Sequence, residues 1–161
     1  MRNIFVPLLA ALAASVAKAA DPTPPGYDFL YTVNATLSPA IQIGDGPQGN
    51  RVAIPIIGGE FHGPKLNGKV LNLGADWGLT DKFGTFHPDT RYHFQTDDGA
   101  NIFIRTSGPA QADGSIHLHV VFETGHPDYY WLNNVVAVGV LHGGDGYVVI
   151  DTWRMTTPAA S

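Results

Sequence analysis

The chain contains no cysteine, and only 14% of its residues are charged. The lack of cysteine excludes disulfide bonds, a thiol nucleophile and a zinc site with cysteine ligands, so the fold must be stable on its hydrophobic core alone. The charged fraction is well below the ~25% of an average domain. After the first nineteen residues, no window of twelve shows the periodicity of an amphipathic helix, so the sequence predicts no long helix.

The first nineteen residues have the pattern of a secretory signal peptide. Arg2 gives a basic start, residues 4–16 form an apolar run, and Ala17-Lys18-Ala19 is a cleavage site with small residues at its ends. The run is shorter than the ~20 residues that cross a bilayer, which argues against a membrane anchor. We therefore expect cleavage after Ala19 and a secreted protein.

The charge balance narrows the range of partners. Loss of Arg2 and Lys18 on cleavage leaves 7 basic and 14 acidic residues, a net charge of −7. An acidic chain without a basic patch argues against a nucleic-acid partner and against an anionic membrane surface. A small molecule is the expected partner, and the oligomeric state stays open.

An N-glycosylation sequon occurs near the start of the mature chain, at Asn34-Ala35-Thr36. In a eukaryotic secreted protein, glycosylation would place Asn34 on the outer surface. Asn34 is therefore the candidate glycosylation site.

The mature chain has the pattern of a single all-β domain. About ten short runs are rich in β-branched and aromatic residues and are separated by turn signals. A barrel is favoured over a sandwich, because closure removes exposed strand edges without disulfides. We expect an extended lead-in over 20–26, the barrel over 27–156 and a tail over 157–161. The candidate strands are 27–37, 41–43, 51–57, 60–62, 66–73, 90–96, 101–106, 116–124, 135–141 and 147–155.

The clearest predicted hairpin joins residues 90–96 to 101–106. Asp98-Gly99 fits the two central positions of a type I′ turn. This loop would pair His93 with Ile104 and Tyr92 with Arg105, and paired residues share a face. Both faces would then mix apolar and polar side chains, which favours a barrel with a partly polar lumen.

A candidate polar site lies in the same region. Asp76 precedes Trp77, and a carboxylate beside an indole can be partly desolvated, which raises its pKa and makes it a usable proton donor or base. Arg91 or Arg105 could pair with Asp76 and orient it. The alternative is a structural ion pair that ties two strands together.

Two other patterns have simpler explanations. His117, His119 and Glu123 share one face of a strand and could bind a metal, but the alternation around them favours a solvated outer face. The loop 44–49 matches G-x-G-x-x-G, but a strand follows it where a dinucleotide site needs a helix. We interpret the loop as a turn, and we predict no cofactor and no metal site.

The aromatic cluster at 129–132, which includes Trp131, could be a lid over a pocket or a plug that closes one barrel end.

Several separated motifs together resemble the domain of unknown function 3237, a family of uncharacterised proteins. They are residues 58–77, the hairpin 91–105, residues 122–124 and residues 130–133, and the resemblance spans 29–153. It implies a meandering antiparallel β-barrel of about 8–10 strands with a central cavity. It also implies cofactor-free cyclisation or isomerisation of small aromatic compounds in secondary metabolism. The family's recurring positions include Asp76, Arg91, Tyr92, Arg105, Trp77 and Trp131.

Three hypotheses follow for the function. In the first, the chain is a secreted acid–base cyclase or isomerase, with Asp76 and Arg91 as catalytic residues and Trp77, Tyr92, Arg105 and Trp131 contacting the substrate. In the second, the barrel binds a small hydrophobic ligand without changing it. In the third, it is a surface or wall-associated structural protein with a filled interior.

Overall fold

The computed structural model describes residues 21–158, so the predicted signal peptide at 1–19 lies outside the described residues. Short strands follow one another through this range, as the turn signals predict. The strands are β1 (Gly26–Leu37), β2 (Ile41–Gly46), β3 (Gly49–His62), β4 (Gly68–Val70), β5 (Ala75–Asp76), β6 (Leu79–Thr80), β7 (Phe86–His87), β8 (Asp89–Thr96), β9 (Asn101–Ser107), β10 (Ile116–Glu123), β11 (Ala137–Gly143) and β12 (Tyr147–Thr156). A 3-10 helix, η1 (Pro127–Asn134), connects β10 to β11. No helix in the described part of the chain has the length and apolar character needed to span a membrane.

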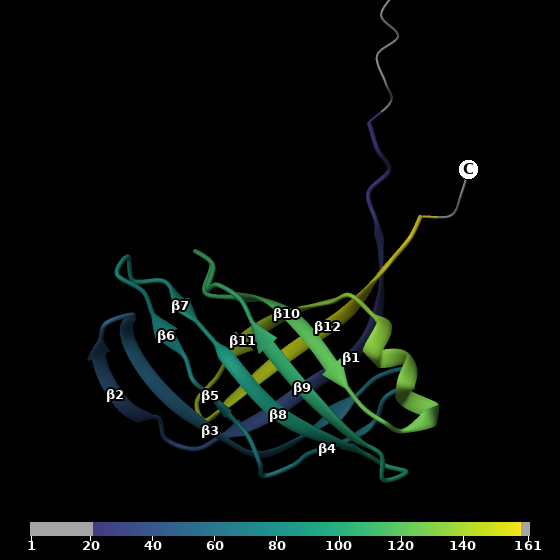
Figure 1. Cartoon of the computed structure of the whole chain (residues 1–161), viewed down its shortest axis with the longest axis horizontal. Helices are drawn as coiled ribbons and strands as arrows, with labels where there is room; N and C mark the ends of the chain where they lie inside the picture. Colours follow the sequence, from purple (N-terminus) through teal and green to yellow (C-terminus); the bar gives the residue numbers. More distant parts are fainter. Residues whose placement is uncertain (1–20, 159–161) are drawn as a thin grey trace, which may run out of the picture.

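The strands close into one antiparallel barrel of eight strands (Figure 1). Neighbours follow the order β1-β12-β11-β10-β9-β8-β4-β3, and β3 returns to pair with β1. Like β4, the short strand β5 pairs with both β3 and β8, so β4 and β5 fill the same place in the strand order. Figure 1 shows η1 at one end of the barrel and β2, β6 and β7 at the other. The predicted all-β meandering barrel is confirmed.

The seam between β1 and β3 depends on a close approach of two backbones. Gly59 has φ +131°, and a Cβ there would lie 2.1 Å from the Asn34 carbonyl oxygen. A side chain at Gly59 would therefore push the two strands apart. The register of this pair shifts between Thr36 and Leu37, because Ile57 of β3 has no partner on β1. Pro55 lies two residues before this bulge, a position in a strand where proline is tolerated.

The barrel interior is packed with aromatic rings at the η1 end. Phe61 and Phe94 stack with ring centroids 3.9 Å apart, and Tyr31 meets them edge-on at 6.1 and 5.3 Å. Leu132 of η1 is buried against this cluster. Large buried rings contribute much of the hydrophobic stabilisation of a small domain. Because Leu132 is buried in this core, η1 acts as a plug at this end of the barrel, one of the two roles considered for residues 129–132.

The β8–β9 hairpin differs from the prediction by one residue of register. The loop has three residues, 97–99: the Gly99 N–H donates to the Thr96 carbonyl, and the Thr96 N–H donates to the Ala100 carbonyl, both at 2.9 Å. Gly99 has φ +92°, as expected for a turn followed by a G1 bulge. Tyr92 therefore pairs with Ile104.

This shift changes the faces of the hairpin, because moving a strand by one residue turns its side chains over. Tyr92 and Phe94 lie inside with Ile102 and Ile104, and all four are buried. The partly polar lumen expected from the two-residue loop is therefore wrong for this hairpin, whose inner face is largely apolar. The Thr96 hydroxyl explains the longer loop, because it donates to the Asp98 carboxylate and accepts the Ala100 N–H at 2.8 Å.

Residues 81–85 form the turn between β6 and β7. The Asp81 carboxylate accepts the N–H groups of Phe83 and Thr85 at 2.8 and 3.0 Å and lies 3.0 Å from His87 Nε2. These hydrogen bonds, led by that of His87, lower the Asp81 pKa. The two-residue strands on either side are too short to show an alternation, but they place Phe86 at the open end of the barrel.

Candidate functional site

A cavity of about 100 Å³ lies inside the barrel, at the end opposite η1. It is therefore displaced from the centre of the lumen, whose other half is filled by aromatic rings. Ten of the lining residues are apolar and four carry polar atoms. They are Ala35, Leu37, Ile54, Ile56, Phe86, Pro88, Ile116, Leu141, Val148 and Ile150, with Asp76, Thr90, Tyr92 and Thr106. The filled interior expected of a purely structural protein is not found.

Asp76 is the only residue with a carboxyl group among the described residues that line the cavity. It lies on β5 and is partly buried, and its Oδ1 accepts the Asp89 N–H at 2.8 Å. Burial raises the Asp76 pKa, while the hydrogen bonds from the Asp89 backbone and the Thr90 hydroxyl oppose part of that rise. A carboxyl with a raised pKa can hold and release a proton closer to neutral pH than an ordinary aspartate can.

Arg91 does not enter this cavity. It alternates along β8 with the buried Thr90 and Tyr92, and therefore faces outward. Its side chain is 42% exposed, and Nη1 lies 3.1 Å from Asp89 Oδ1. The expected meeting of Asp76 with an arginine inside the barrel is therefore wrong, because strand alternation points the two side chains to opposite sides of the wall.

Side chains on the outer face of the barrel wall contact the residues that neighbour Asp76. The Arg91 guanidinium lies 5.7 Å from the centroid of the Trp77 ring, within cation–π range. Arg51 Nη1 donates to the Trp77 carbonyl at 2.7 Å. Trp77 follows Asp76 in the chain. Asp89 donates its N–H to Asp76, and its carboxylate pairs with the Arg91 guanidinium. We call Trp77, Asp89 and Arg91 the outer clamp, because together they brace the backbone on both sides of Asp76.

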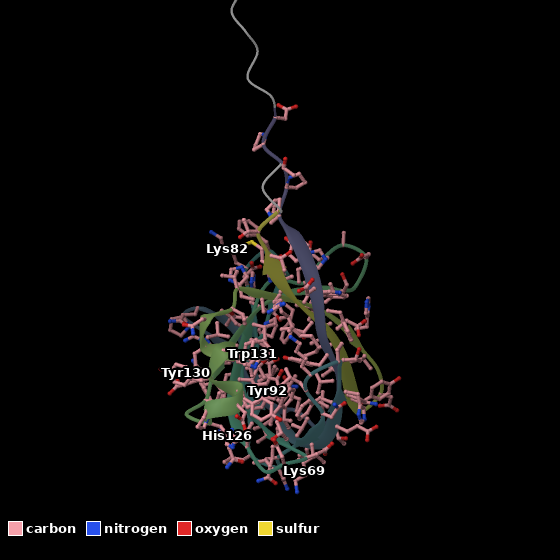
Figure 2. The ribbon with its side chains drawn as sticks, turned by 90° about the vertical axis from the view of Figure 1, so that its right-hand side faces the viewer. Lys69, Lys82, Tyr92, His126, Tyr130 and Trp131 are labelled. Carbon is pink, nitrogen blue, oxygen red and sulfur yellow. The ribbon has the colours of Figure 1, made fainter. Side chains whose placement is uncertain are left out.

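Of the four residues predicted to contact a substrate, Tyr92 alone lines the cavity, and Figure 2 labels it inside the barrel. Its hydroxyl, like those of Tyr31 and Thr152, is buried without a protein partner in hydrogen-bond geometry. Burial raises the pKa of both tyrosines, so Tyr92 presents a neutral ring. Arg105 is exposed on the outer face opposite Arg91. Trp131 lies on η1, at the other end of the barrel.

The cavity also includes residues that the sequence did not single out. Thr90 shares the inward side of β8 with Tyr92, so the alternation of that strand could have identified it. Thr106 occupies the same position on β9, directly opposite Thr90. Phe86, on β7, and Pro88, between β7 and β8, also line the cavity, and no periodic pattern predicts that placement.

The remaining candidates lie on the outside. His117, His119 and Glu123 are exposed on β10, while the alternating Leu118, Val120 and Phe122 are buried, so the favoured solvated face is confirmed. Among residues 21–158, no three His, Cys, Asp or Glu side chains are grouped so that they could hold a metal ion. Asn34 is exposed on β1. The G-x-G-x-x-G run forms the β2–β3 turn, with Gly46 paired to Gly49, as interpreted.

A protein-family model described as "Protein of unknown function (DUF3237)" matches residues 25–117 and 109–155. The chain belongs to the DUF3237 family. Similar curated proteins include a hydroalkoxylation enzyme of Penicillium herquei, 33% identical over 155 residues, covering 96% of this chain and 99% of that protein. A UPF0311 protein of Rhodopseudomonas palustris is 31% identical, covering 79% of this chain and 94% of that protein.

Solved structures give the same result for the fold. A β-barrel-like protein of Acinetobacter baumannii has a TM-score of 0.77 at 34% identity, covering 84% of this chain and 99% of that one. An enzyme from Penicillium herquei has a TM-score of 0.72 at 30% identity, covering 86% of this chain and 99% of that one. DUF3237 relatives thus share this barrel, and at least one of them is an enzyme.

Proposed function

We propose that this chain is a cofactor-independent enzyme that performs acid–base chemistry on a small, largely apolar molecule, with Asp76 as the proton donor and acceptor. The observation that carries this proposal is the position of Asp76. It is the carboxyl group of a cavity with ten apolar lining residues, and burial raises its pKa. A titratable group with a shifted pKa in an apolar pocket is a common mark of a catalytic site.

The similar Penicillium enzyme suggests the reaction class, because hydroalkoxylation adds the O–H bond of an alcohol across a C=C bond and forms an ether. Protonated Asp76 would give its proton to one alkene carbon and leave a positive charge on the other. A hydroxyl of the same substrate would then attack that carbon and form a C–O bond, and its proton would return to Asp76. Substrate and product are isomers, so the step needs no oxidant and no reductant.

The apolar lining has a specific use in such a reaction. A carbocation in water is captured by solvent, which would give an alcohol in place of the cyclic ether. Side chains such as Ile56, Ile116 and Ile150 keep water away from the reacting carbon, and the neutral ring of Tyr92 adds a face that tolerates positive charge. The ionised form of Asp76 then stabilises the cation that it has created.

The cavity volume limits the part of the substrate that enters. About 100 Å³ is of the same order as the ~150 Å³ apolar cavity that admits benzene, and is below the ~300 Å³ of a drug-sized site. The rim residues Leu37, Phe86 and Val148 are partly exposed, so the cavity opens at that end. The reacting alkene and hydroxyl would lie inside, with the rest of the molecule outside the rim.

The proposal is tested with Asp76→Asn, which keeps the acceptor for the Asp89 N–H but cannot donate a proton from the side chain. The purified protein is incubated with a panel of apolar alkenols whose hydroxyl can close onto their own C=C, and cyclic ethers are separated by chiral chromatography. Wild type should give one enantiomer in excess, and Asp76→Asn should lose at least about 100-fold in rate, the usual contribution of a general acid. Asp145→Asn, in the exposed β11–β12 loop, is the matched control. Full turnover by Asp76→Asn would remove Asp76 from the mechanism.

A second candidate function is a carrier for a small hydrophobic ligand, which the predominantly apolar lining favours. The same variant separates the two, because a carrier would show altered affinity in Asp76→Asn and no turnover in either protein. Native mass spectrometry of the purified chain would then find a bound, unmodified molecule at one equivalent.

We also propose that the chain is exported, on the pattern of residues 1–19, and that Asn34 carries a glycan when the host has N-glycosylation. The exposure of Asn34 on β1 supports the second part. Intact mass of the protein from culture medium should start at Ala20, and Asn34→Gln should remove any glycan mass. A mature protein that still begins at Met1 would contradict export by this route.

A further inference from the structure

A second concave surface lies at the η1 end of the barrel, and it shares no residue with the Asp76 cavity. It has a volume of about 230 Å³ and lies between β1, the turn after β3, η1 and β12. Trp131 lines it. Figure 2 shows Trp131 on the side of η1 that faces the barrel and Tyr130 on the side that faces away, and Tyr130 is 57% exposed. We call this surface the Trp131 groove.

The charges of the Trp131 groove are unusual for an acidic chain. Lys65 Nζ and the Arg154 guanidinium each lie 6.0 Å from the centroid of the Trp131 ring. Arg154 donates through Nε and Nη2 to Asp28 Oδ2 at 3.2 and 2.7 Å, so one carboxylate offsets one cation. Lys65 forms no ion pair with any described residue. The groove therefore carries a net positive charge on a protein whose formal net charge is −5.

The uncharged part of the groove lining is apolar. Phe29, Leu30 and Pro64 line the groove together with the Trp131 indole. A distance of 6.0 Å is the outer limit for a cation–π contact, so neither cation is fixed on the ring. A flat ring laid on the indole would reach both cations with a negative group at its edge. Arginine suits such a group, because its planar fork matches a carboxylate.

We propose that the Trp131 groove is a binding site for a small aromatic carboxylate, with the ring stacked on Trp131 and the carboxylate between Lys65 and Arg154. A non-aromatic anion would use the charges but leave the indole uncovered. An uncharged aromatic would cover the indole but leave Lys65 without a partner. The combination of charge and ring selects the aromatic acid. This inference does not depend on the proposed catalytic role of Asp76.

The experiment follows the indole N–H signals of the full secreted chain by NMR, with the Trp131 signal assigned through Trp131→Phe. Benzoate is the probe, and acetate, inorganic phosphate and benzyl alcohol are the comparisons. Benzoate should shift the Trp131 signal saturably, and the three comparisons should bind at least about tenfold more weakly. Equal binding of phosphate or acetate would reduce the site to a general anion site, and equal binding of benzyl alcohol would remove the role of charge. Either result overturns the proposal.

Two variants with opposite expected effects make the test sharper. Lys65→Gln should weaken benzoate binding about fivefold, as the loss of up to ~1 kcal/mol from one exposed ion pair predicts. Asp28→Asn should tighten it, because it releases the donors of Arg154. Lys82→Gln is the matched control, since Lys82 lies 4.9 Å from the Phe83 ring but far from Trp131 (Figure 2). Unchanged binding in both Lys65→Gln and Asp28→Asn would overturn the proposal.

Discussion

The Arg91 guanidinium lies 5.7 Å from the centroid of the Trp77 ring, on the outside of the barrel wall whose inner side carries Asp76. The outer clamp therefore links the exposed surface to the proposed proton donor through backbone alone. Arg91 does not line the cavity, and we propose that it acts only as a positioning residue for Asp76. In this proposal Arg91 would act on Asp76 through the wall, although the alternation of β8 directs its side chain into solvent.

We expect Arg91→Gln to loosen the wall around Asp76 while leaving the barrel folded. The Arg91–Asp89 pair and the stack on Trp77 are largely exposed, so their loss should cost only about 1 kcal/mol. Water would then reach Asp76 more easily, and its pKa should fall toward the ordinary value. Carbon-13 NMR titration of the Asp76 carboxyl measures this shift directly. Arg105→Gln is the control, because Arg105 lies opposite Arg91 on the same face without a stack. An unchanged Asp76 pKa in Arg91→Gln would show that the outer clamp is only structural.

The pH dependence of stability gives a second prediction for Asp76. Its folded pKa is raised above the unfolded value of ~3.9. The folded state therefore binds the proton more tightly, and the stability this gives is present below the unfolded pKa and is lost as pH rises through the folded pKa. Asp76→Asn should be more stable than wild type at pH 7, and the difference should shrink as pH falls toward 4. Urea unfolding across pH 4 to 8 measures it, with Asp145→Asn expected to show no such trend. A difference that grows on acidification would contradict the raised pKa.

Individual residues show which features of the fold and site could be predicted from the sequence and which could not. The alternation of β10 was enough to place His117 and His119 outside, and the charge beside an indole was enough to select Asp76. The register of β8 and β9 was missed because the Thr96 hydroxyl favours a three-residue loop, and the shift pairs Arg105 with Arg91 on the outer face, where the alternation along β8 already directs Arg91. The partner of Asp76, the Asp89 backbone N–H, comes from another strand and leaves no trace in the local pattern. Strands of two residues, such as β5, show no period at all.

Filling the cavity should separate stability from function. Ala35 is buried on β1 and faces the cavity. Ala35→Leu would place three more carbons in the empty volume, and we expect a gain of about 1 kcal/mol in the free energy of unfolding. Ligand binding or turnover should be lost, because the same volume is no longer free. Ala35→Val provides a smaller step that should show both effects in part. Retained turnover in a stabilised Ala35→Leu protein would place the chemistry elsewhere.

The turn that sets the inner face of the β8–β9 hairpin can be tested through Gly99. Its φ of +92° is unfavourable for a residue with a Cβ, yet a Cβ there would meet no atom within 4 Å, so a substitution isolates the backbone cost. Gly99→Ala should lower the free energy of unfolding by about 1 kcal/mol, or roughly 3 °C in Tm for a domain of this size. Gly143→Ala is the matched control, since a Cβ there also meets nothing and no positive φ is required. Because register depends on this loop, Gly99→Ala should also broaden the NMR signals of Tyr92 and Ile104, whereas equal stability of the two alanine variants would show that the three-residue turn does not constrain the hairpin.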